Sequence, residues 1–431
     1  MMAFRTFFGQ VHLWLGLFSG LVVFILGLTG CIMAYQEELQ NWMYSNKLKV
    51  EAATFNEPMA LSRLHEKAQS AMGPETPIQR IIIPNSPGNS IAFRYVKRDK
   101  NTSGIWYWDE IPRDELVYIN PYTAEVIQKE DRTFSFFSVV LRLHYSLLLK
   151  TKLGKPIIGS AALIFLIMLI TGLILWWPKN KKALKVSTWF RWNPKTKWKR
   201  KNYDLHNILG FYSIFFALFI AITGLMWAFT WFNDGVQWLA NGGEAHPKER
   251  VMVKSDVTLS SSVHYLDIIH ENLKSTYPNA KTYFINLPKD SLGVVGGYVY
   301  NSEAKKNIYL LFDRYSGELL HDGDKWEDKT NGEKVMAYTL DIHTGAIGGI
   351  VGKTVAFLTS LFSASLPVTG FLIWWGRRRK KSRNRGNKMY PELGLVQEVN
   401  ESFPENEGVV FLNVPGDDNK SGKNKDNGRA W

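Results

Sequence analysis

The segment "QVHLWLGLFSGLVVFILGLTG", residues 10–30, decides how this chain must be organised. It is apolar over about 20 residues, the length of helix that crosses the ~30 Å hydrocarbon core of a bilayer. A histidine, His12, stands at its start. Ionisable side chains in membrane spans are costly and usually mark function. The segment therefore predicts a membrane helix in which His12 has a specific partner.

Three further apolar runs are long enough to span a membrane, and the basic residues flank them. The four runs are roughly residues 11–35, 157–177, 206–231 and 354–375. The net charge of +13 is concentrated in residues 178–204, with ten Lys/Arg and one acid, and in residues 377–388, with eight Lys/Arg and no acid. Because short basic segments stay in the cytoplasm, both termini are predicted cytoplasmic. A nucleic-acid surface is disfavoured, because these charges adjoin helix ends.

The chain contains an internal repeat. "VHLWLGLFSGLVVFILGLTG" aligns with "LHNILGFYSIFFALFIAITG", with His12 matching His206 and Thr29 matching Thr223, both at an offset of 194 residues. The second and fourth runs also match, and each is preceded by a histidine, His144 or His343. A duplicated unit with parallel topology is typical of repeats related by an axis along the membrane normal.

The long segments between the spans repeat as well. "LSRLHEKAQ" resembles "LDIIHENLK", and both read as helices. "VYINPYTAEVI" resembles "YLLFDRYSGELL", and both read as strand, turn, strand. The predicted fold is thus four transmembrane helices, as a duplicated helix–domain–helix unit, with two extracytoplasmic α+β domains. The predicted parts are a first span over 1–36, a domain over 37–136, an outer amphipathic segment and second span over 137–178, a basic cytoplasmic loop over 179–204, a third span over 205–232, a second domain over 233–340, an outer segment and fourth span over 341–376, and a basic, then disordered tail over 377–431.

The four repeat-related histidines form two pairs, one at each membrane face. His12 and His206 begin their helices at the cytoplasmic side, whereas His144 and His343 precede their spans on the outer side. Two imidazoles from two helices can bind a haem iron from opposite sides, and an iron with both axial positions filled suits electron transfer. Structural zinc, by contrast, takes four protein ligands, and a proton relay usually adds intramembrane acids, which these spans lack.

Two glycines and two helix breakers bear on these pairs. Gly16 and Gly210 lie one turn after His12 and His206, on the same helix face, where a missing side chain leaves room for a flat ring. His144 stands well before its span, so Gly154 and Pro156 are expected to break the helix between them. Residues 137–149 and 341–351 would then fold back at the outer surface.

The motifs together resemble the PepSY-associated transmembrane family. They are "QVHLWLGLFSGLVVFILGLTG", "YQEELQNWMY", "VYINPYTAEVI" and "LHNILGFYS", and the resemblance covers about residues 1–385. It departs from the family pattern at Asn120 and Ala124, where the family favours Asp and Gly, and at Arg314 in place of Pro. The family includes bacterial ferric-siderophore reductases with two b-type haems and two external PepSY domains.

The resemblance implies two haem b groups, with axial ligands His12 and His206 for the inner haem and His144 and His343 for the outer haem. Covalent attachment is not expected, because the single cysteine, Cys31, forms no Cys-x-x-Cys-His motif. Three basic residues, Arg5, Arg142 and Lys353, are candidate partners for haem propionates. Their alternative role is to anchor helix ends at the interface.

The predicted function is an oxidoreductase of the bacterial inner membrane. By resemblance to the ferric-siderophore reductases, electrons would pass from a cytoplasmic reductant or flavoprotein to a periplasmic ferric siderophore, reducing its iron to Fe(II). The alternative is a membrane-tethered PepSY interaction or regulatory protein without redox activity. It would regulate a peptidase, or sense a metal through the repeat-matched His65 and His270. Those two histidines also fit an ordinary position on a helix surface.

Overall fold

The computed structural model of the chain describes residues 2–51, 57–245 and 253–389, and residues 1–375 form one compact unit. Residues 390–431, most of the predicted tail, lie outside the described residues. The helices are α1 (Met2–Ala34), α2 (Gln36–Met43), α3 (Ser45–Leu48), α4 (Leu61–Met72), α5 (Tyr107–Glu110), α6 (Phe136–Ser146), α7 (Thr151–Trp176), α8 (Lys181–Ser187), α9 (Trp198–Ala228), α10 (Thr230–Ala240), α11 (Tyr265–Thr276), α12 (Asn331–Thr344) and α13 (Gly349–Met389), with short 3-10 turns η1 (Ala304–Lys306) and η2 (Ala346–Gly348). The strands are β1 (Arg80–Pro84), β2 (Ile91–Lys97), β3 (Arg113–Ile119), β4 (Val126–Asp131), β5 (Thr282–Asn286), β6 (Val295–Tyr300), β7 (Ile308–Phe312) and β8 (Leu319–His321).

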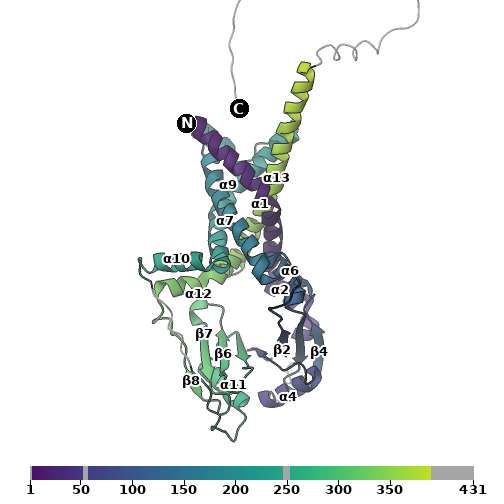
Figure 1. The fold of residues 1–431 in the computed structure, drawn as a ribbon, viewed down its shortest axis with the longest axis vertical. Helices are drawn as coiled ribbons and strands as arrows, with labels where there is room; N and C mark the ends of the chain where they lie inside the picture. Colours follow the sequence, from purple (N-terminus) through teal and green to yellow (C-terminus); the bar gives the residue numbers. More distant parts are fainter. Residues whose placement is uncertain (1, 52–56, 246–252, 390–431) are drawn as a thin grey trace, which may run out of the picture. The chain divides into compact units, whose positions relative to one another are not determined.

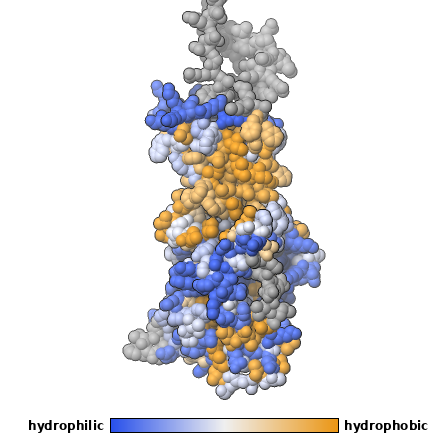
Figure 2. All heavy atoms as spheres, turned by 90° about the vertical axis from the view of Figure 1, so that its left-hand side faces the viewer, coloured by the Kyte–Doolittle hydropathy of each residue, from blue (hydrophilic) through white to orange (hydrophobic). Residues whose placement is uncertain are grey.

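Four of these helices are long and apolar enough to cross a membrane, which confirms the predicted spans. The candidate spans are Phe4–Ala34, Thr151–Trp176, Trp198–Ala228 and Ala346–Arg378. Between 22% and 33% of the most apolar stretch of each span is buried inside the protein, and the other residues are at least partly exposed, as expected where lipid is the solvent. Figure 2 shows the resulting hydrophobic surface over the helices, with hydrophilic residues beyond both ends. The chain is therefore a membrane protein.

The four spanning helices pack as a bundle. Helix α7 lies between α1 and α9 (Figure 1). Helix α1 meets α13 at Gly27, where a Cβ atom would lie 2.8 Å from the Ser360 carbonyl oxygen. Helix α9 meets α13 through the buried Asn202 amide, which donates to the Thr369 carbonyl at 3.0 Å. Small residues at helix contacts are typical of membrane bundles, because they let backbones approach closely.

The strands of the two repeats form one sheet. The strand order is β4-β3-β2-β1-β5-β6-β7-β8, so each repeat supplies four consecutive strands. Strands β1 and β5 join the halves in antiparallel register, with Ile81 opposite Ile285 and Ile83 opposite Tyr283. The two α+β units predicted from the sequence are therefore joined through a continuous sheet rather than separated.

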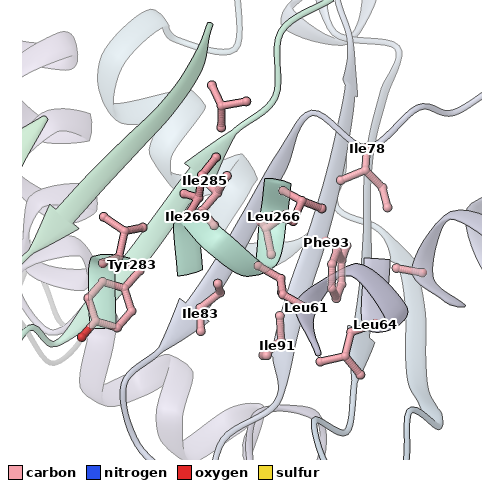
Figure 3. Packing of buried hydrophobic residues seen from close by; sticks show 14 of the residues in the cluster. Leu61, Leu64, Ile78, Ile83, Ile91, Phe93, Leu266, Ile269, Tyr283 and Ile285 are labelled. Atoms are coloured by element: carbon pink, nitrogen blue, oxygen red, sulfur yellow. The ribbon is translucent and has the colours of Figure 1, made fainter. Parts of the chain in front are cut away.

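Helices α4 and α11 pack side by side on one face of this sheet. Their buried side chains, such as Leu61 and Leu266, point toward strand residues such as Phe93 and Ile285 (Figure 3). Burial of an aliphatic or aromatic side chain contributes about 1.5–3 kcal/mol, so this shared core stabilises the pairing of the two repeats. The opposite face is partly covered in the first half, where Leu48 packs near Leu116.

The predicted strand–turn–strand motifs are confirmed. They are the β3–β4 and β7–β8 hairpins. In the first turn, the Asn120 side chain accepts from the Tyr122 amide at 2.9 Å, and in the second Asp313 accepts from the Tyr315 amide at 2.7 Å. Ala124 has a φ of 58°, a conformation that costs an L-residue about 1 kcal/mol or more. The departure from the family's glycine at this position therefore leaves strain in the turn.

The predicted break between His144 and the second span exists, but its position differs from the prediction. Helix α7 begins at Thr151 and contains both Gly154 and Pro156, so these residues do not end a helix. The chain turns instead at Leu147 and Leu148, whose φ values are 54° and 62°. The separate helix α6 is close to the outer segment predicted over residues 137–149.

A distant segment holds this turn in place. The Tyr107 amide donates to the Leu148 carbonyl at 2.9 Å, and the Lys150 amide donates to the Ile105 carbonyl at 2.8 Å. Gly154 permits the tight return of the chain, because a Cβ atom there would overlap the Ser146 backbone. The glycine is thus needed for close approach rather than for helix termination.

Candidate functional site

The inner pair of histidines comes together between α1 and α9. The ring centres of His12 and His206 lie 6.4 Å apart, with an angle of 90° between the ring planes. Both helices carry the histidine near the beginning of an apolar run, so the repeat alignment places them at one level of the bundle. The structure therefore brings together the two residues that the sequence paired.

The outer pair comes together in the same way, from α6 and α12. The ring centres of His144 and His343 lie 6.1 Å apart, at an interplanar angle of 75°. Each residue is in the last turn of its helix, just before the chain returns into a spanning helix. The short outer helices are thus the elements that carry these imidazoles to the bundle.

Each histidine is held by the threonine of a Thr-Gly dipeptide on a neighbouring helix. The Nδ1 to Oγ1 distances are 2.9 Å for His12 and Thr171, 2.9 Å for His206 and Thr369, 2.8 Å for His144 and Thr29, and 3.0 Å for His343 and Thr223. The sequence used these threonines only to align the repeats. The contact between helices gives them a role that no local pattern reveals.

The threonine hydrogen bonds define the tautomer of the imidazoles. The Thr29 hydroxyl donates to the Ile25 carbonyl at 2.7 Å, and the Thr223 hydroxyl donates to the Phe219 carbonyl at 2.8 Å. Because the hydroxyl hydrogen is engaged in this way, we assign the oxygen as acceptor and the histidine Nδ1–H as donor. The His343 Nδ1 also lies 3.0 Å from the Ile220 carbonyl, which can only accept. The Nε2 lone pair is then left available to bind a metal.

The glycine of each Thr-Gly dipeptide lies against the imidazole ring. A Cβ atom would lie 3.3 Å from the His12 Cε1 at Gly172, 3.2 Å from the His206 Cε1 at Gly370, 3.2 Å from the His343 Cε1 at Gly224, and 3.7 Å from the His144 Cε1 at Gly30. A larger side chain at the tighter positions would displace the ring. The dipeptide thus supplies both a hydrogen-bond acceptor and a close backbone surface.

The spacing of the rings fits two imidazoles that share one metal ion. For two nitrogens that bind one metal ion from opposite sides, metal–nitrogen bonds of about 2.0–2.1 Å and about 1.2 Å from each nitrogen to its ring centre place the centres about 6.4 Å apart. The observed distances of 6.4 Å and 6.1 Å match this value. Among the described residues, no group of three or more His, Cys, Asp or Glu side chains could hold a metal ion. Each pair would therefore need additional ligands from a bound group.

A cavity of about 380 Å³ adjoins the outer pair. Its lining includes both outer histidines and is mostly apolar, with small residues such as Gly27, Gly30 and Gly224. The Trp227 ring lies 5.1 Å from the His343 ring and also lines it. Clefts or cavities with a mostly apolar lining and a few polar groups are the usual form of cofactor sites.

The two glycines predicted to leave room for a flat ring lie at helix contacts near the inner pair. A Cβ atom at Gly16 would lie 2.9 Å from the Met168 Cε, and at Gly210 it would lie 3.6 Å from Leu366. The Met168 contact involves the end of a flexible side chain, which can move. A cofactor-binding role for Gly16 and Gly210 remains a prediction.

The basic residues proposed as propionate partners have other contacts. Arg5 donates to the Trp177 carbonyl at 2.5 Å, beside the end of α7. Arg142 donates to the Tyr145 hydroxyl at 3.1 Å and lies over the Tyr145 ring. Lys353 pairs with Glu38 at 2.6 Å. Arg142 is the one of these three whose hydrogen-bond partner, Tyr145, also lines the outer cavity.

The remaining candidates, His65 and His270, lie at equivalent positions of the sheet region. The His65 ring is 6.3 Å from Phe93, and the His270 ring is 6.5 Å from Tyr283. Burial lowers the pKa of both imidazoles, so they are neutral in the folded protein near neutral pH. Their contacts are those of half-buried packing residues.

The comparison with known proteins gives a family. No match was found among curated proteins. The profile of the PepSY-associated TM region matches residues 10–377, a range that includes both histidine pairs and nearly all residues of the four spanning helices. The chain belongs to the PepSY-associated TM region family.

Proposed function

We propose that the chain binds two haem b groups and transfers electrons across the bacterial inner membrane. His12 and His206 would be the axial ligands of the inner haem, and His144 and His343 those of the outer haem. The observation that carries the proposal is the arrangement of two imidazole pairs at the spacing of two ligands on one metal ion, with no hydrogen bond to Nε2 from the residues that the structure describes. Haem iron with two axial histidines supplies reversible one-electron oxidation and reduction.

The composition of each site favours a macrocycle over a zinc ion. Structural zinc takes four protein ligands, whereas each site here offers two imidazoles among the described residues. A porphyrin provides the four equatorial nitrogens itself. Its apolar surface also suits the lining of the outer cavity, in which apolar area predominates.

The residues of the chain then fix the ligand geometry. The four threonines orient the imidazoles through Nδ1, and such supporting hydrogen bonds raise ligand basicity and metal affinity. Helix α1 contributes to both sites, because it carries His12 of the inner site and Thr29 of the outer site. The residues between them rise about 26 Å along α1, so the sites lie toward opposite membrane faces.

The distribution of basic residues supports the direction of electron transfer, and the family resemblance supports the choice of acceptor. The basic segment at 178–204 favours a cytoplasmic position for the inner pair. A cytoplasmic reductant or flavoprotein would supply electrons there, and a periplasmic ferric siderophore would accept them at the outer side. Reduction loosens the complex, because hard oxygen chelators hold ferric iron more strongly than ferrous iron.

The experiment is spectroscopy on the purified protein followed by reoxidation. Reduced-minus-oxidised spectra should show b-haem bands, and a ferric hydroxamate or catecholate chelate should reoxidise the reduced protein with formation of Fe(II). A natively folded, colourless protein would overturn the proposal and favour the regulatory alternative. Haem bands without reoxidation by any ferric chelate would retain electron transfer and overturn the siderophore acceptor.

A further inference from the structure

Lys155 is a basic residue that lines the outer cavity, on the first turns of α7. Among the residues that the structure describes, no acid lies within ion-pair distance of it, and its side chain makes no hydrogen bond. A half-buried ammonium group that lines a mostly apolar cavity loses hydration, and buried charges in proteins are usually paired. The position therefore needs an explanation beyond helix formation.

Comparison with the other repeat shows that Lys155 lacks the ion pair that its counterpart forms. Its counterpart is Lys353, which lies 198 residues later, the offset that also separates Thr171 from Thr369. Lys353 pairs with Glu38 at 2.6 Å and lies 3.9 Å from Glu37, both on α2. The lysine of the second repeat is thus paired with carboxylates that the first repeat supplies.

The acids are missing from the corresponding place beside Lys155. Helix α10 follows α9 as α2 follows α1, and the 194-residue offset places Trp231 and Phe232 where Glu37 and Glu38 stand. The packing confirms the correspondence: Gly159 of α7 lies against the Phe229 ring, as Phe357 of α13 lies 5.8 Å from the Tyr35 ring. Two aromatic residues thus replace two carboxylates, which leaves the lysine free to face a ligand.

We propose that Lys155 binds a carboxylate of the group in the outer cavity, namely a propionate of the outer haem. This inference rests on the proposed function. An ammonium group in the lining of a mostly apolar cavity matches a ligand that is apolar except for carboxylates at one edge. The half-buried Lys155 would also favour the reduced form of the outer haem, because a nearby positive charge opposes oxidation.

The test compares Lys155→Gln with Lys152→Gln, an exposed lysine one turn earlier on α7 that does not line the cavity. Transfer of the outer haem to a haem-scavenging apoprotein should become about tenfold faster in Lys155→Gln, the lower end expected for loss of a charge-assisted hydrogen bond. The midpoint potential of the outer haem should fall, and Lys155→Arg should restore both properties. Lys152→Gln should leave them unchanged.

A second variant uses the repeat itself. Phe232→Glu places the carboxylate of the first repeat beside Lys155, so it should reproduce the effects of Lys155→Gln and add nothing in the double variant. If Lys155→Gln behaves like Lys152→Gln in a protein that holds two haems, Lys155 serves only a lipid headgroup and the inference is wrong. If the wild type holds no outer haem, the proposed function itself is wrong. This result differs from the previous one, in which both haems are present and only the role of Lys155 is wrong.

Discussion

The substitution Thr29→Val removes a hydrogen-bond acceptor of His144 and little else. Thr29 is 5% exposed, and its hydroxyl accepts from the His144 Nδ1 at 2.8 Å while it donates to the Ile25 carbonyl. Valine has nearly the same shape, so the packing of α1 is kept. The change therefore isolates the support that the threonine gives to the outer site.

The magnitude follows from the contacts of the ring. The substitution removes the hydrogen bond from the His144 Nδ1 to Thr29 but leaves the ring beside Gly30, so it weakens the support without abolishing it. Loss of one neutral hydrogen bond costs about 1 kcal/mol, or about fivefold in an equilibrium constant. Changes to such supporting groups at metal sites cost about 10–100-fold in affinity. We expect about five- to tenfold weaker binding of the outer haem.

The assay is haem dissociation, followed separately for the two haems by their reduction potentials. Thr29→Val should accelerate loss of the outer haem alone, and Thr29→Ser, which keeps the hydroxyl, should behave like the wild type. Thr171→Val is the matched control, since its partner is His12 and it should affect the inner haem alone. An effect of Thr29→Val on the inner haem, with the outer haem unchanged, would refute the reasoning.

Two predictions concern the sheet region. Ala124→Gly should raise the free energy of unfolding by about 1 kcal/mol, because glycine adopts the positive φ of the β3–β4 turn without strain. Thermal denaturation in detergent measures this change. An unchanged or lower stability would contradict the prediction. Acidification from about pH 7.5 to 5 should lower the melting temperature, because the pKa values of His65 and His270 are lowered in the folded protein and the unfolded chain gains protons below about pH 6.5. Replacing both histidines by Gln should flatten this dependence, and a curve identical to that of the wild type would show that other groups cause it.

The spanning helices and the pairing of the histidines could be predicted from the sequence because both follow from local patterns. Apolar length determines a span, and the offset between repeats shows which residues are equivalent. The same patterns gave the hairpins and the helices around His65 and His270. Each of these features depends on residues that are near in the chain or repeated along it.

The features that the sequence did not predict depend on contacts between distant segments. The break before the second span was assigned to Gly154 and Pro156, but residues 105–107 hold the turn at Leu147 and Leu148. The pairing of β1 with β5 joins the two repeats through alternating residues that would fit either an edge or a central strand. The role of the Thr-Gly dipeptides also appears only when neighbouring helices are packed.

The central claim is that each imidazole pair binds one haem, and haem stoichiometry tests it most directly. Pyridine haemochrome and iron analysis of the purified wild type should give two b-type haems per chain. His12→Ala should lose the inner haem alone and His144→Ala the outer haem alone, leaving one per chain in each variant. A folded wild type without haem, or variants that retain two haems per chain, would contradict the account.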